Sequence, residues 1–105
     1  MPRPRRHRWV RHAPNVTFFK PQGIPLNQLD EVVLTVEEYE ALRLADLESK
    51  PQVRAAGEMG ISQPTFNRLL TSARNKVAEA LVRGKAIKVS GGHHIILAHT
   101  PESEK

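Results

Sequence analysis

Hydrophobic residues recur at helical spacing in two stretches of the chain, and each stretch follows a residue that can cap a helix. The first begins after Thr35, where Thr-Val-Glu-Glu has the form of a capping box. The second begins after Ser62 and carries apolar side chains at positions 66, 69, 70, 73, 77, 80 and 81. We therefore predict a helix from 36 to about 48, and a second of about twenty residues that ends at Gly84.

A shorter helix is predicted between these two. Ser49 is its expected N-cap, and Gly60 ends it because glycine accepts the positive φ of a helix terminus. The spacing is that of a helix-turn-helix, which needs a small residue at the crossing, a glycine in the turn and apolar side chains that hold the angle. The full pattern reads Gln52-x-x-x-Ala56-x-x-x-Gly60-Ile61-Ser62-x-x-x-Phe66-x-x-Leu69.

The ends of the chain favour extended structure. Residues 16–20 form a short β-type run, and five of the eight prolines lie within the first 27 residues, which excludes a long helix there. Residues 86–90 and 93–98 are expected to form a hairpin turned by Gly91-Gly92, which pairs with 16–19. Residues 32–34 either lead into the first helix or extend a short helix from Leu26.

These elements fit one domain of mainly α class. We expect a helix-turn-helix, winged or decorated by a hairpin, with a basic N-terminal arm and a small β element from the N- and C-terminal segments. The predicted segments are a basic, proline-rich arm with a short strand at 1–27, the helical helix-turn-helix domain at 28–85, and a β-type segment with a polar tail at 86–105.

Charge is unevenly distributed along the chain. Sixteen Lys and Arg face eleven Asp and Glu, which gives a net charge of +5 and an isoelectric point near 10.1. Residues 1–20 contain no acid, residues 30–48 are strongly acidic, and residues 50–88 are basic again. A polyanion would be attracted by the first and third blocks, so the acidic block is expected to face away from a nucleic acid.

Other classes of protein lack support in the sequence. Cysteine is absent, no apolar run is long enough to cross a membrane, and no secretory signal is present, so we expect a soluble cytoplasmic protein. No phosphate loop, nucleophile motif or acid–base pair indicates an enzyme or a cofactor. The five histidines are interpreted as surface residues, because His93 and His94 would point to opposite faces of a strand and no metal is implied.

The exposed start of the long helix is the predicted reading surface for double-stranded DNA. Arginine pairs well with guanine, Asn and Gln with adenine, and Thr with a phosphate or a thymine methyl group. The candidates for base contacts are Gln63, Pro64, Thr65, Asn67 and Arg68. The candidates for backbone contacts are Arg3, Arg5, Arg6, Arg8, Lys50, Arg54, Ser62, Arg74 and Lys76.

Nearly the whole chain, from Met1 to about Gly92, resembles a small uncharacterised prokaryotic family of predicted DNA-binding proteins. The stretches that carry the resemblance are Met1-Pro2-Arg3-Pro4-Arg5-Arg6, Phe19-Lys20-Pro21-Gln22-Gly23-Ile24-Pro25-Leu26, Glu31-Val32-Val33-Leu34-Thr35, Glu40-Ala41-Leu42-Arg43-Leu44-Ala45-Asp46, Met59-Gly60-Ile61-Ser62 and Lys76-Val77-Ala78-Glu79-Ala80-Leu81. The family's helix-turn-helix is similar to region 4 of sigma-70-type transcription factors. The resemblance implies a DNA-binding regulator of transcription.

The chain departs from the family pattern at two places. It has Gln52-Val53-Arg54-Ala55-Ala56 where the family tends to have Gln-Glu-Glu-Ala-Ala. It also has Gln63 where arginine often follows the cap serine, so a preferred DNA site or affinity of its own is expected.

Two alternatives to DNA reading remain open at this stage. The acidic first helix suggests a module that docks on transcription machinery without reading DNA. RNA binding is a second alternative, although the aromatic residues that stack on bases are scarce. Trp9 either stacks on a base or covers the predicted hairpin. DNA-binding proteins with a helix-turn-helix often act as dimers, so we expect a homo-oligomer. An apolar strand that pairs with a second subunit is one way in which it could form.

Overall fold

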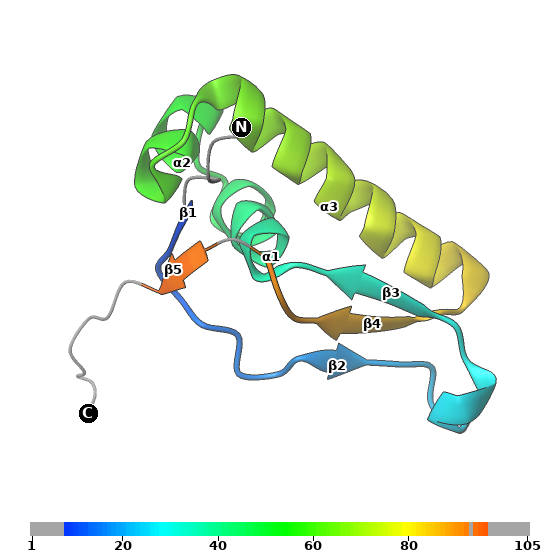
Figure 1. The fold of residues 1–105 in the computed structure, drawn as a ribbon. Helices are drawn as coiled ribbons and strands as arrows, with labels where there is room; N and C mark the ends of the chain where they lie inside the picture. Colours follow the sequence, from blue (N-terminus) through cyan, green and yellow to red (C-terminus); the bar gives the residue numbers. More distant parts are fainter. Residues whose placement is uncertain (1–7, 93, 97–105) are drawn as a thin grey trace, which may run out of the picture.

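The computed structural model describes residues 8–92 and 94–96. The protein is mainly helical and carries a small three-stranded sheet (Figure 1). In chain order the elements are β1 (Arg8–Val10), β2 (Phe18–Phe19), the 3-10 helix η1 (Leu26–Gln28), β3 (Glu31–Leu34), α1 (Val36–Leu42), the π-helix η2 (Arg43–Leu47), α2 (Gln52–Met59), α3 (Gln63–Arg83), β4 (Ala86–Val89) and β5 (His94–Ile96).

The three-stranded sheet has the order β2-β4-β3, and α3 runs along one of its faces (Figure 1). β3 and β4 are parallel, and the crossover that a parallel pair needs is supplied by α1, η2, α2 and α3, which lie between them in the chain. β2 is antiparallel to β4, with Phe18 opposite Lys88 and Phe19 opposite Ile87. The predicted pairing between the N-terminal run and the C-terminal segment is therefore confirmed.

Residues 31–34 form a strand that leads directly into α1, so the interpretation as a lead-in holds and the extended helix from Leu26 is wrong. Val32 and Leu34 are buried on the side of the core, whereas Glu31 and Val33 are exposed. This alternation is the period of a half-buried strand. Four residues, however, are too few to distinguish the pattern of a strand from that of a short helix. The strand positions Thr35 directly at the start of α1.

The predicted C-terminal hairpin is also wrong. β4 and β5 belong to different sheets, and β5 instead pairs in parallel with β1, with Arg8 opposite His94. The Gly91-Gly92 pair does not reverse the chain. The Gly91 carbonyl accepts a hydrogen bond from the Val36 amide, and a Cβ on Gly92 would lie 2.0 Å from the Glu37 carboxylate. The two glycines let the chain pass closely over the start of α1.

The helix termini follow the predicted caps, with one exception. Thr35 and Glu38 form the capping box of α1, and the predicted extent to about residue 48 is met because η2 continues the helix to Leu47. Gly60 and Gly84 end α2 and α3 in the left-handed conformation. Ser49 is not the N-cap of α2: its φ is +56°, and Pro51 takes that position.

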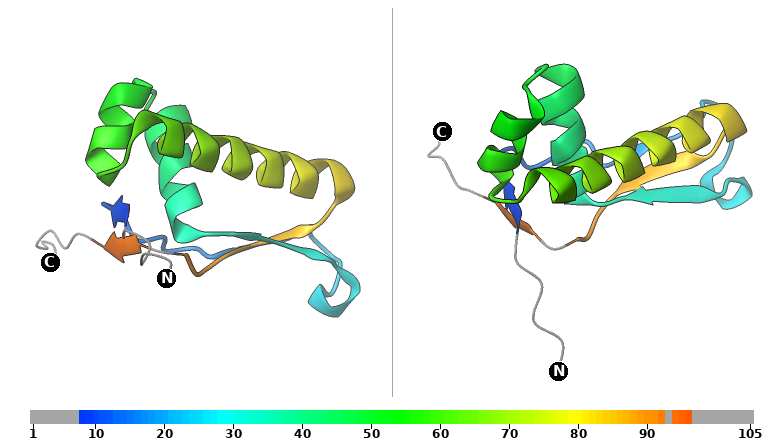
Figure 2. Two further views of the ribbon diagram at one scale, coloured as in Figure 1. Left: turned by 45° about the horizontal axis from the view of Figure 1, so that its top comes forward. Right: turned by 90° about the horizontal axis from the view of Figure 1, so that it is seen from above.

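The core has two parts that share the side chain of Leu42. One lies among α1, η2, α2 and the first half of α3, and is formed by Ala41, Leu44, Ala55, Ala56, Met59, Phe66 and Leu70. The other lies where α1 and α3 meet the strands, and is formed by Val10, Leu34, Val36, Ala73 and Val89. The long α3 spans both parts (Figure 2), so its first turns are held by the helices and its last turns by the sheet.

Candidate nucleic-acid interface

The connection between α2 and α3 is tight and internally bonded. The Ile61 amide donates to the Ala56 carbonyl at 3.0 Å, while Gly60 holds φ at +68°. Ala56 and Phe66 are buried between the two helices, and Ile61 packs against the same cluster. The apolar positions of the sequence pattern therefore fix the angle between α2 and α3.

The first two turns of α3 present a polar outer face. Ser62 caps the helix by accepting the Thr65 amide at 3.3 Å. Phe66 and Leu70 are buried, whereas Gln63, Pro64, Asn67 and Arg68 are exposed and Thr65 is half-buried. All five base-contact candidates thus lie within the first two turns of one rigidly packed helix.

A short chain of hydrogen bonds orders this surface. Ser62 Oγ lies 3.0 Å from Thr65 Oγ1, which accepts a bond of 3.3 Å from Arg68 Nη2. Within residues 8–92, Arg68 makes no ion pair. Its charge is therefore available to an anionic or electronegative ligand, and Thr65 limits the directions in which it points.

Three of the backbone-contact candidates form ion pairs on the surface. Lys50 lies 2.7 Å from Glu58, and its hydrogen bond lowers the pKa of that carboxyl group. Arg54, which is largely exposed, reaches the same carboxylate at 3.4 Å. Arg74 forms a two-bond pair with Asp46, with distances of 2.6 and 3.1 Å. Arg54 and Arg74 are exposed and their pairs are weak, so a phosphate can compete for these two cations, whereas the Lys50–Glu58 pair is partly buried.

Arg8 and Lys76 instead contact buried acids. Arg8 Nη1 lies 3.3 Å from Glu37 and is mostly covered, which gives this residue a role in holding β1 onto α1. Lys76 lies 2.7 Å from Glu38 and is only partly exposed. The other cations of the predicted arm, Arg3, Arg5 and Arg6, lie outside the described residues.

The sequence reasoning missed a cluster of buried carboxylates in the acidic block. Glu37, Glu38 and Glu40 are 3%, 5% and 0% exposed. Glu40 accepts two hydrogen bonds from Arg43 and one of 2.8 Å from the Arg11 amide. A signal was present, because positions 37, 40, 41 and 44 have the spacing of one helix face, but only the last two are apolar.

The Glu38 carboxylate accepts three hydrogen bonds, as that of Glu40 does. Burial by itself raises the pKa of the Glu38 carboxyl group. Hydrogen bonds from Lys76, from the Ser72 hydroxyl and from the Thr35 amide outweigh that effect, and the pKa of Glu38 is lowered. The carboxylate therefore joins the start of α1 to the middle of α3.

β1 lies beside the start of α3. The Trp9 ring lies over the turn, where a Cβ on Gly60 would be 3.1 Å from it, and part of the ring is exposed. A shallow cleft at this point is lined by Arg8 together with Gly60, Ser62 and Thr65. Trp9 thus covers the turn between α2 and α3, and not a hairpin.

No group of three or more His, Asp or Glu side chains that could hold a metal ion occurs among residues 8–92 and 94–96. His7, His93 and His99 lie outside the described residues. Within the same part of the chain, no helix is long and apolar enough to cross a membrane.

The family model described as "Protein of unknown function DUF134" matches residues 1–97, which is almost the full length of the chain. The chain belongs to the DUF134 family. The resemblance to an uncharacterised prokaryotic family is therefore confirmed, whereas DNA binding and the similarity to sigma-70 region 4 stay predictions, because the family's description names no activity.

Curated relatives of the DUF134 protein carry the name UPF0251 protein and come from bacteria. One from Caldanaerobacter subterraneus subsp. tengcongensis is 62% identical over 94 residues, which cover 90% of this chain and 80% of the relative. One from Pelotomaculum thermopropionicum is 50% identical over 105 residues, covering 100% of this chain and 80% of the relative. No solved structure matches the chain.

Proposed function

We propose that this DUF134 protein is a sequence-specific double-stranded DNA-binding protein that regulates transcription. In this proposal α2, Gly60 and α3 act as a helix-turn-helix, and the first turns of α3 enter the major groove. The observation that carries the proposal is the outward polar face of α3, with Asn67 and Arg68 exposed beside the buried Phe66. Asn and Arg at such positions match the hydrogen-bonding edges of adenine and guanine.

The electrostatics of this end of the molecule support the proposal. The helix dipole makes the start of α3 attractive to a phosphate. Arg54 on α2 is highly exposed, and Lys50 precedes that helix. The pair that the exposed Arg54 forms with Glu58 is weak enough for a phosphate to displace the acid, whereas Lys50 is partly covered.

The position of β1 supports a role for the basic arm. Residues 1–7 precede β1, which is held beside the start of α3 by the Arg8–Glu37 pair and by the Trp9 ring on the turn. Seven extended residues reach about 23 Å. Arg3, Arg5 and Arg6 are therefore attached within reach of phosphates or of a minor groove next to the groove read by α3.

The burial of the α1 carboxylates weighs against the alternative of an acidic docking helix. Glu37, Glu38 and Glu40 point into the protein and are engaged with Arg8, Lys76 and Arg43. This leaves α1 with few acidic groups to offer a basic partner. A binding function also accounts for the described surface without any catalytic step.

The proposal is tested by titrating fluorescent duplex DNA, single-stranded DNA and duplex RNA with the full chain at two salt concentrations. We expect duplex DNA to bind most tightly, with an affinity that falls steeply as salt rises. The variant Asn67→Ala/Arg68→Ala is expected to weaken duplex binding by about 1–3 kcal/mol for each lost base contact.

The matched control is Asn27→Ala/Lys88→Gln, which removes one amide and one positive charge on η1 and β4. Both residues are exposed, and both lie outside α2 and α3. This control should bind duplex DNA as the unaltered protein does. Equal losses in the two variants, or absence of duplex binding at low salt, would refute a reading role for α3.

A further inference from the structure

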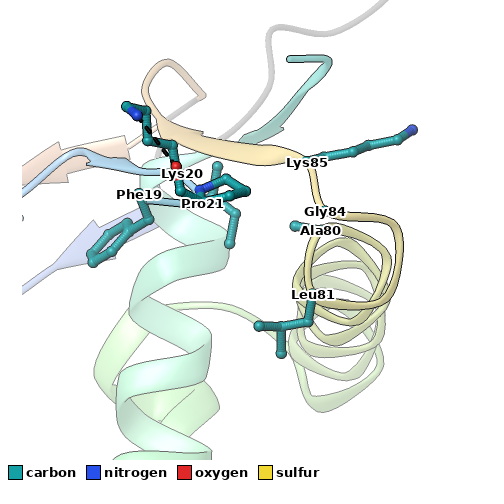
Figure 3. Close-up of a pocket in the computed structure, with 8 residues that line it drawn as sticks. Phe19, Lys20, Pro21, Ala80, Leu81, Gly84 and Lys85 are labelled. Carbon is teal, nitrogen blue, oxygen red and sulfur yellow. Dashed lines mark hydrogen bonds between the residues drawn. The ribbon is translucent and has the colours of Figure 1, made fainter. Parts of the chain in front are cut away.

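The last turns of α3 expose an apolar patch formed by Ala78, Leu81 and Val82, here called the α3 patch. Leu81 and Val82 are 76% and 83% exposed. Leu81 points into a shallow cleft whose other side is Phe19 and Pro21 (Figure 3). Seen from above in Figure 2, none of the described elements passes over this stretch of α3. Apolar side chains gathered on an open face indicate a surface for association.

Two opposite charges lie on one flank of the α3 patch. Glu79 and Arg83 are one helical turn apart, and both line the same shallow depression as Ala78 and Val82. Glu79 uses one carboxylate oxygen for Lys85. Within residues 8–92, Arg83 makes no ion pair. The flank therefore offers both an acceptor and a donor to a partner.

We propose that the α3 patch is the interface of a homodimer in which the two α3 helices pack antiparallel. The two-fold axis of this dimer passes beside Leu81. A position two residues before Leu81 in one copy then faces the position two residues after Leu81 in the other copy. Glu79 then lies opposite Arg83 of the second copy, and the reverse pair forms at the same time. Leu81 then meets Leu81 of the second copy, so the apolar side chains at the axis are covered by each other.

The charge pattern favours a second copy over other occupants. The exposed Leu81 and Val82 side chains offer no hydrogen bond to a phosphate backbone, and a uniformly basic or acidic protein would meet one like charge. An antiparallel copy is the partner for which the same two residues form two ion pairs. Thirteen residues separate Leu81 from Arg68, which is about 20 Å along the helix, so the patch and the candidate DNA surface are separate.

The sequence suggested that two copies associate through an apolar strand, but the strands are less suited to this contact than α3. β4 is the central strand of its sheet and has β2 and β3 on its two edges. β5 is already paired with β1. The exposed apolar side chains of α3 and the charges beside them assign the contact between copies to the helix.

The proposal is tested by sedimentation equilibrium of the full chain over a wide range of concentration, without DNA. The unaltered protein should form dimers, and Leu81→Gln/Val82→Gln should weaken the dimer by about tenfold or more, through loss of apolar burial. Leu47→Gln is the control, because Leu47 is 77% exposed and lies on η2, outside the patch. Thermal unfolding verifies that the variants fold.

A charge exchange tests the antiparallel register. Arg83→Glu and Glu79→Arg should each weaken the dimer, because each variant alone brings like charges together. A mixture of the two variants restores opposite charges at both contacts and should dimerise. A protein that stays monomeric at every concentration, or a dimer that none of these substitutions weakens, would overturn the proposal. Because no DNA is present, this outcome is independent of the proposed DNA binding.

Discussion

At the scale of single residues, the buried glutamates of α1 hold the molecule together by charge. Glu37 is joined to β1, Glu38 to α3, and Glu40 to Arg43 and to the amide that follows β1. Removal of one partner from such a pair leaves a charge in a poorly solvated place, which costs more free energy than the pair contributes. These acids could not be located from charge alone, because a run of Glu residues is usually a solvated surface.

Glu38→Gln is expected to lower the free energy of unfolding at pH 7 by about 1–3 kcal/mol, through loss of charge-assisted hydrogen bonds. The pKa of Glu38 is lowered in the folded protein from an ordinary value of 4.5, so the ionised carboxylate stabilises the folded protein above that pH. This stabilisation is lost as pH falls through the lowered pKa of the folded state.

Urea unfolding at pH 7 and at about pH 3 measures both effects, and the variant should lose less stability on acidification than the unaltered protein. Glu31→Gln, on the exposed face of β3, serves as the control for neutral pH and should change stability by less than about 0.5 kcal/mol. Equal acid sensitivity in Glu38→Gln and the unaltered protein would contradict the assigned pairing.

Gly60→Ala tests the tight turn. The variant must place a Cβ 3.1 Å from the Trp9 ring at a φ of +68°, so we expect a loss of about 1–2 kcal/mol in unfolding free energy. Gly57→Ala is the comparison, because this glycine lies inside α2 with no atom within 4 Å of its Cβ position. It should stabilise the protein by about 0.5–1 kcal/mol. Denaturant unfolding measures the change in the free energy of unfolding for each variant. If this change had the same sign in both variants, the turn would not need glycine.

At the scale of elements, the helices and the pairing of β2 with β4 were predictable, whereas the partners of β3 and β5 were not. The helices carry local signals in Thr35, Ser62 and the two terminal glycines, and each signal acts within one turn. β3 and β5 are short, and their partners lie far away in the chain, so no local rule identifies them. The start of α3 was located correctly as an exposed polar face, whereas the covered state of Arg8 depends on a contact with Glu37 that only the fold creates.

Gly92→Ala tests the route of the chain from β4 to β5. A Cβ at this position meets the Glu37 carboxylate at 2.0 Å, so the β1–β5 pairing should be weakened. Gly91→Ala is the matched control, since its φ is also positive but its Cβ position has no atom within 4 Å. We expect Gly92→Ala to lose at least about 1 kcal/mol more stability than Gly91→Ala. Hydrogen exchange at the amides of 8–10 would locate the loss, and equal exchange in both variants would contradict it.

At the scale of the whole molecule, one long helix connects two surfaces of different character. The first turns of α3 are polar and lie near exposed cations, and its last turns carry the apolar α3 patch. The basic arm, residues 1–7, is attached near the start of α3, because β1 is held beside the turn between α2 and α3. This arrangement assigns DNA contact and self-association to opposite ends of α3.

Deletion of residues 2–7 removes Arg3, Arg5 and Arg6 and leaves Arg8 on Glu37. Duplex DNA affinity should fall, and the slope of log affinity against log salt should decrease by about 2–3 if these arginines contact phosphates. The fold should be retained, which circular dichroism would verify. An unchanged salt slope would exclude the arm from the interface.

The central claim, that α3 reads DNA sequence, is tested most directly by selection from a library of randomised duplexes. The unaltered protein should enrich a defined motif. Asn67→Ala/Arg68→Ala should retain salt-dependent binding but lose the base preference at the positions that these two side chains contact. Enrichment of the same motif by both proteins, or of no motif by the unaltered protein, would contradict the claim.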